Sequence, residues 1–117
     1  MHRSVLLILV STIATPGWAQ SQAAVKRNDY PFQCGAAFAI MAKVLQEAGD
    51  AEKSAAYQAK FEKLAGRAEA SFQTSNKTRA EAQSYMQEHV NSLATIAETD
   101  ARQVINYARR CEELFPD

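Results

Sequence analysis

From about residue 30 to the C-terminus, apolar residues recur at the three-to-four-residue spacing of amphipathic helices. No segment alternates between apolar and polar residues with a period of two. Valine and isoleucine are few while alanine is abundant, so strands are not expected. The pattern predicts four helices, at about 31–48, 51–72, 79–97 and 101–115. Because the connections are short, we expect an all-α fold, a small up-down-up-down four-helix bundle.

The first predicted helix begins and ends with clear local signals. Asp29 can cap it, Pro31 suits the first turn because its missing N–H costs nothing there, and Gly49 can end it. Its expected buried face combines four residues at helical spacing with three beside them: Cys34, Phe38, Met41, Leu45, Ala37, Val44 and Ala48.

The second predicted helix follows after only Gly49-Asp50, so the first two helices are expected to form an antiparallel hairpin. Its apolar stripe consists of Tyr57, Phe61, Leu64, Ala68 and Phe72. The hairpin resembles a single tetratricopeptide unit at Leu45, Gly49-Asp50 and Phe61. The pattern does not recur further along the chain, so we assign no family.

Two capping signals delimit the last two predicted helices. Thr78 and Glu81 form a capping box, in which each side chain satisfies a free backbone N–H of the other. The sequence Thr99-Asp100, followed by Gln103, is a further start signal. We therefore predict a break near residue 100. A single bent helix is the alternative, because no Gly or Pro separates the two segments.

The first nineteen residues differ from the rest. A short cationic start precedes the apolar run SVLLILVSTIA, and a helix-breaking end, TPGWAQ, carries Gly17 and Ala19 at the −3 and −1 positions of a cleavage site. This order is typical of a secretory signal peptide, with cleavage after about Ala19. Residues 20–29 are then a flexible lead-in, and residues 30–117 form one helical domain. An uncleaved membrane anchor is the alternative.

The charge balance excludes some binding functions. Of the 13 basic residues, cleavage removes Arg3 and leaves 12 against 13 acidic ones. No basic run exceeds two residues, so the charge pattern of a nucleic-acid or anionic-membrane binder is absent. No other apolar run reaches membrane-spanning length, and we expect no membrane insertion after signal removal.

The two cysteines, Cys34 and Cys111, both fall on predicted apolar faces. The bundle topology brings the start of the first helix and the end of the last to the same end, and an exported chain meets oxidising conditions. We therefore predict one disulfide between them. Tyr30, Phe32 and Phe115 are expected to pack over this end as a lid.

Other candidate chemistry is sparse. Met86 and His89, three residues apart on one helix, are weak candidates for a copper site. No clustered Cys/His ligand set, C-x-x-C pair, nucleophile elbow or phosphate loop is present, and the glutamates fall on solvated faces. We therefore expect no cofactor and no enzymatic activity.

These features favour a small exported protein of the periplasm or the extracellular space that binds another protein of the bacterial cell envelope. An inhibitor, an immunity protein or an accessory subunit would each fit. The alternative is a periplasmic protein that binds a small ligand or a metal such as copper in the bundle interior. The sequence does not identify the partner, the binding surface or the oligomeric state.

Overall fold

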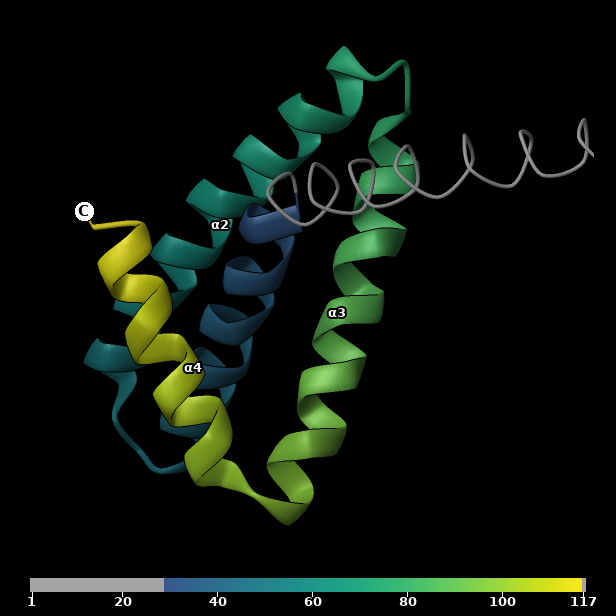
Figure 1. Cartoon of the computed structure of the whole chain (residues 1–117). Coiled ribbons are helices and arrows are strands. Elements are labelled where there is room, and N and C mark those ends of the chain that lie inside the picture. The colour runs from purple at the N-terminus through teal and green to yellow at the C-terminus, as the bar shows by residue number, and fades with distance from the viewer. Residues whose placement is uncertain (1–28, 117) are drawn as a thin grey trace, which may run out of the picture.

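The computed structural model describes residues 29–116, and within them the regular secondary structure is all α-helix (Figure 1). A helix over 29–47 is followed by α2 (Ala51–Thr74), α3 (Arg79–Thr99) and α4 (Ala101–Leu114). The four helices alternate in direction, which confirms the predicted up-down-up-down bundle. The expected signal peptide and nearly all of the lead-in lie outside the described residues. No helix among those described is both long and apolar enough to cross a membrane.

The helix ends follow local capping chemistry. The turn that terminates helix 29–47 contains Gly49, whose φ is +86°. The Asp50 N–H then donates to the Leu45 carbonyl at 2.9 Å. Asn76 takes the same left-handed role after α2, with φ of 61°. After both helices, backbone N–H groups of the turn donate to carbonyls of the last helical turn and so satisfy acceptors that the helix leaves free. At the start of α3, Thr78 and Glu81 form the predicted capping box.

The predicted break between α3 and α4 is confirmed at Asp100. Its backbone leaves the helical region, with φ of −151° and ψ of 80°, while its N–H still donates to the Ile96 carbonyl at 2.8 Å. Its carboxylate also accepts a hydrogen bond from the backbone N–H of Gln103, and this bond caps the start of α4. One aspartate therefore ends one helix and begins the next without any glycine or proline.

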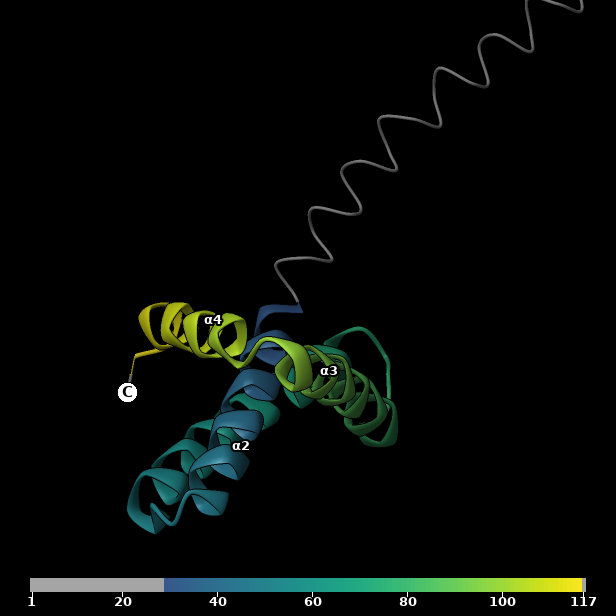
Figure 2. The same cartoon turned by 90° about the horizontal axis from the view of Figure 1, so that it is seen from below.

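Helix 29–47 lies at the centre of the bundle, where the other three helices converge (Figure 2). One of its faces packs with α2 and α4 in a cluster of Cys34, Ala37, Phe38, Leu64, Ala108 and Cys111. A second face packs with α2 and α3 in a cluster of Phe32, Ala36, Ala68, Ala82 and Met86. Gly35 leaves room for the Met86 side chain between helix 29–47 and α3, because a Cβ placed there would lie 2.8 Å from the Met86 methyl carbon and that side chain would have to shift.

Three details of the first predicted helix are wrong. Asp29 is already helical, and its carboxylate accepts a hydrogen bond from the Tyr85 hydroxyl at 2.7 Å. Phe32 is 1% exposed and belongs to the core, not to a lid. Val44 (47% exposed) and Ala48 are exposed, so the buried face of this helix ends before the last predicted turn.

Candidate functional site

The cysteine pair joins the first and last helices of the described chain. Cys34 and Cys111 form a disulfide across a Cα–Cα distance of 5.3 Å, and each residue is 1% exposed. Neither cysteine is a free thiol. The predicted disulfide is confirmed, and the bond closes the bundle without contributing a reactive group.

An aromatic cluster forms where the start of helix 29–47 meets α2 and α3. The Phe32 ring lies 4.7 Å from Phe72 and 4.8 Å from Tyr85, measured between ring centroids. The imidazole of His89 stands edge-on to Tyr85 at 4.8 Å. Packing in this cluster fixes the orientation of the His89 ring.

The two weak metal candidates, Met86 and His89, line different cavities. Met86 is 7% exposed and lines a groove between α2 and α3. His89 lines a pocket between α3 and α4. Within residues 29–116, no group of three or more His, Cys, Asp or Glu side chains could hold a metal ion. We therefore derive no metal chemistry from this pair.

The α2–α3 groove, as we call the first of these cavities, has a volume of about 330 Å³. The two helices meet at their connection and diverge from there (Figure 1). The residues that line the groove come from α2, from α3 and, through Phe32, from helix 29–47. Its apolar lining is Phe32, Phe61, Ala65, Ala68, Ala82, Met86 and Val90, and its polar lining is Glu69, Gln83 and Gln87. At one end, Arg79 Nε of α3 bonds to the Glu69 carboxylate of α2 at 2.6 Å.

The α3–α4 pocket, the second cavity, has a volume of about 360 Å³. Its lining is Gln33, His89, Ser92, Leu93, Ile96, Gln103, Val104, Tyr107 and Arg110. The Tyr107 hydroxyl donates to Gln33 Oε1 at 3.2 Å, and the Arg110 guanidinium lies 5.5 Å from the Tyr107 ring centroid. The Nε2 atom of His89 is buried and has no hydrogen-bond partner among the described residues.

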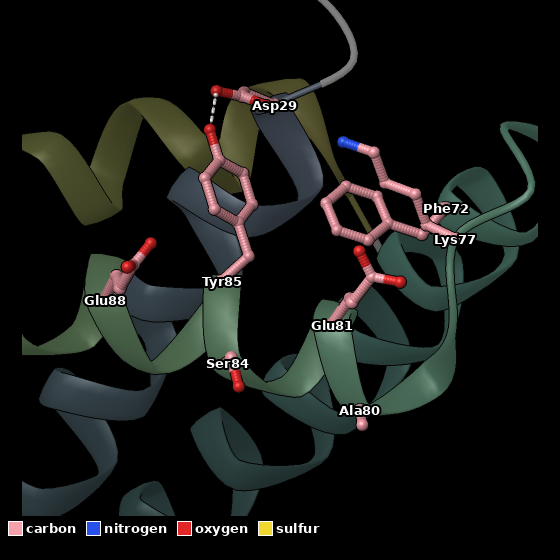
Figure 3. Close-up of a pocket in the computed structure, with 8 residues that line it drawn as sticks. All are labelled: Asp29, Phe72, Lys77, Ala80, Glu81, Ser84, Tyr85 and Glu88. Carbon is pink, nitrogen blue, oxygen red and sulfur yellow. Dashed lines mark hydrogen bonds between the residues drawn. The ribbon is translucent and has the colours of Figure 1, made fainter.

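A third cavity opens at the start of α3 (Figure 3). Tyr85 and Asp29 hydrogen-bond across it, and the Lys77 ammonium lies 4.7 Å from the Phe72 ring centroid. The Glu81 carboxylate, which also borders it, accepts the capping bond from the Thr78 N–H. These polar groups are used in holding the helices together, so this cavity is a weaker candidate than the α3–α4 pocket.

Two tyrosine hydroxyls are perturbed by carboxylates. Burial and the hydrogen bond to Glu112 (2.6 Å) raise the pKa of Tyr57 to about 12. The hydrogen bond to Asp29 is the main cause that raises the pKa of Tyr85 to about 12. Both groups therefore stay protonated donors at physiological pH and connect α2 to α4 and α3 to helix 29–47.

Comparison with protein-family models, with curated proteins and with solved structures finds no match for this chain. The cavities and the residues that line them are therefore the features from which a function can be inferred. The sequence pointed to His89 but not to the groups around it. Gln33 lies on helix 29–47, whereas Tyr107 and Arg110 lie one turn apart on α4, so the three residues share no sequence motif. The sequence holds one signal for this site: Tyr107 and Arg110 are three residues apart on one helix, so their side chains are neighbours on the same face.

Proposed function

We propose that this chain is an exported helical protein that binds another protein of the bacterial cell envelope through the α2–α3 groove. The leader-like sequence of residues 1–19 and the buried Cys34–Cys111 disulfide both support an oxidising compartment outside the cytoplasm. An inhibitor, an immunity protein or an accessory subunit would each act in this way.

The observation that carries the proposal is the composition of the groove. Three of its lining residues are alanines. Ala68 and Ala82 are buried and form the floor of the groove, and the small side chain of the partly buried Ala65 leaves room for a partner above it. Phe61 and Val90 are only partly buried and add apolar surface on opposite sides. Apolar surface of this kind, rimmed by polar residues, is typical of a protein-binding site.

The rim indicates the chemistry of the partner. Gln83 and Gln87 are exposed and carry amides, and Glu69 is already paired with Arg79. A rim of amides and an internal ion pair does not select strongly for either sign of charge. The partner segment that fits best is an amphipathic helix with small or medium apolar side chains on one face and uncharged polar side chains beside it.

Site-specific photo-crosslinking in the envelope of the producing cell tests the proposal. A photoreactive residue replaces Gln83 or Gln87 at the rim, and Arg102 on α4 serves as the control position. We expect one discrete adduct with the same envelope protein from both rim positions and none from the control. Equal adducts from all three positions, or none from the rim, would contradict the proposal.

A matched pair of charge substitutions then separates the groove from the rest of α2. Ala65→Glu places a carboxylate in the groove, whereas Ala59→Glu places one on an exposed position of the same helix. We expect Ala65→Glu to abolish the adduct and Ala59→Glu to retain it, while both variants keep the helical circular dichroism spectrum. An adduct whose mass equals two copies of this chain would identify self-association instead.

A further inference from the structure

The α3–α4 pocket has the composition of a small-molecule site. Leu93, Ile96 and Val104 form an aliphatic wall, and a few polar groups face the same space. A volume of about 360 Å³ lies within the range of ligand pockets, which are mostly apolar with a small number of placed polar groups.

One polar atom of a residue that lines the pocket lacks a partner. The Nε2 atom of His89 is buried, yet no described residue accepts or donates a hydrogen bond to it. Its ring is held edge-on to Tyr85 and roughly parallel to Phe32, so it cannot turn freely toward solvent. Buried polar atoms without partners are rare in folded proteins, and each needs an explanation.

The charge of the pocket indicates the class of ligand. Arg110 is the one charged group among the described residues that line it, and no carboxylate is among them. The Arg110 guanidinium packs on the ring of Tyr107, whose hydroxyl bonds to Gln33, so both side chains are positioned by the fold. Arginine in such a setting recognises a carboxylate through paired N–H donors.

We propose that the α3–α4 pocket binds a small organic acid with an aliphatic body. The carboxylate lies between the Arg110 guanidinium and the Nε2–H of His89, and the hydrocarbon chain packs on Leu93, Ile96 and Val104. This site is separate from the α2–α3 groove and does not depend on the function proposed for that groove.

The test uses three probes of equal chain length: octanoate, octanol and octylammonium. His89 is the single histidine after residue 19, so the imidazole resonances of a chain without the leader and without a histidine tag need no further assignment. We expect octanoate to shift these resonances saturably at millimolar concentration. We expect octanol to bind on the order of tenfold more weakly, because a charge-assisted hydrogen bond is lost, and octylammonium not to bind. Equal binding of the three probes, or no shift with any of them, would overturn the proposal.

Three variants locate the site. Arg110→Gln should weaken octanoate binding on the order of tenfold. His89→Phe keeps an aromatic ring in the cluster but removes the reporter imidazole, so its octanoate binding is followed by isothermal titration calorimetry, and it should be weaker than that of the parent on the order of tenfold. Arg102→Gln, at an exposed position of α4 that does not line the pocket, should bind octanoate as the parent does. Unchanged binding in Arg110→Gln, or an equal loss in Arg102→Gln, would refute the assignment. If a variant fails to fold, the probe comparison on the parent protein still decides.

Discussion

Removal of the disulfide should destabilise the bundle strongly. The bond joins residues 77 apart in the sequence, and in the chain-entropy model a closed loop of that length contributes about 4.5 kcal/mol at 25 °C. A domain of this size has a total free energy of unfolding of only roughly 5–15 kcal/mol. The double variant Cys34→Ala, Cys111→Ala should therefore melt about 18–36 °C lower than the oxidised parent, at about 4–8 °C per kcal/mol.

Urea denaturation followed by circular dichroism separates the crosslink from the packing of the two sulfur atoms. Loss of packing lowers the midpoint and leaves the m-value unchanged. Loss of the crosslink also raises the m-value, because the unfolded chain expands and exposes more surface. We expect both changes in the double variant, and no effect of a reductant on it. Since Cys34 and Cys111 are both buried, reduction of the parent should require partial unfolding.

The reasoning would be refuted by equal unfolding midpoints of the oxidised parent and the double variant. It would also be refuted by a lower midpoint with an unchanged m-value, since that result would assign the whole effect to packing. Labelling of free thiols in the unfolded parent is the control, because it establishes that the starting material is oxidised.

Three further predictions concern single positions. Gly66→Ala in α2 should raise the free energy of unfolding by about 1 kcal/mol, because a Cβ at this exposed site meets no atom within 4 Å. Thermal denaturation checks this prediction, and a lower melting temperature of the variant would contradict it. Asn76→Ala should lower the free energy of unfolding by about 1 kcal/mol, because Asn76 has a φ of 61°. The Asn76→Gly variant should have a melting temperature equal to or above that of the parent. Equal losses in both variants would show that the backbone conformation is not the cause. Tyr57 and Tyr85 have an ordinary pKa of 10.0 and a folded-state pKa of about 12. The folded state therefore keeps these protons to a higher pH than the unfolded state does. This contribution to stability is complete below pH 10 and is lost between pH 10 and about 12. Absorbance at 295 nm should show that these tyrosines of the parent ionise above pH 10, and Tyr85→Phe should reduce the loss of stability at alkaline pH.

The helix boundaries were predictable because they depend on short-range chemistry. Gly49, Thr78 and Asp100 each act through hydrogen bonds to residues within five positions along the chain. The disulfide was predictable for a different reason. Once four helices alternate in direction, Cys34 and Cys111 must lie at the same end, and both fall on apolar faces.

The second buried face of helix 29–47 was missed. Phe32, Ala36 and Ile40 recur every four residues and are all buried. From Phe32 to Ala42 only Gln33 is polar, and a helix that is apolar on all sides is buried on all sides. A single apolar stripe accounts for only one of these faces, whereas the continuous apolar run predicts burial on more than one.

The α3–α4 pocket could not be predicted from sequence. Its shape depends on the angle between two helices and on which ring supports His89, and both are set by tertiary packing. The pairing of Tyr107 with Gln33 joins residues 74 positions apart, with no local pattern to announce it.

The position of the disulfide also changes the topology of the covalent chain. Cys34 and Cys111 enclose all three connections between helices, so the backbone between them and the bond form a covalent ring. A protease that cuts once inside this ring, for example at the exposed turn before Asp50, opens the ring but releases no fragment. The two pieces remain one molecule with every helix intact, and a second cut is needed before any helix can be lost. A single internal cleavage that would divide an open chain into two separate fragments therefore leaves this chain covalently joined.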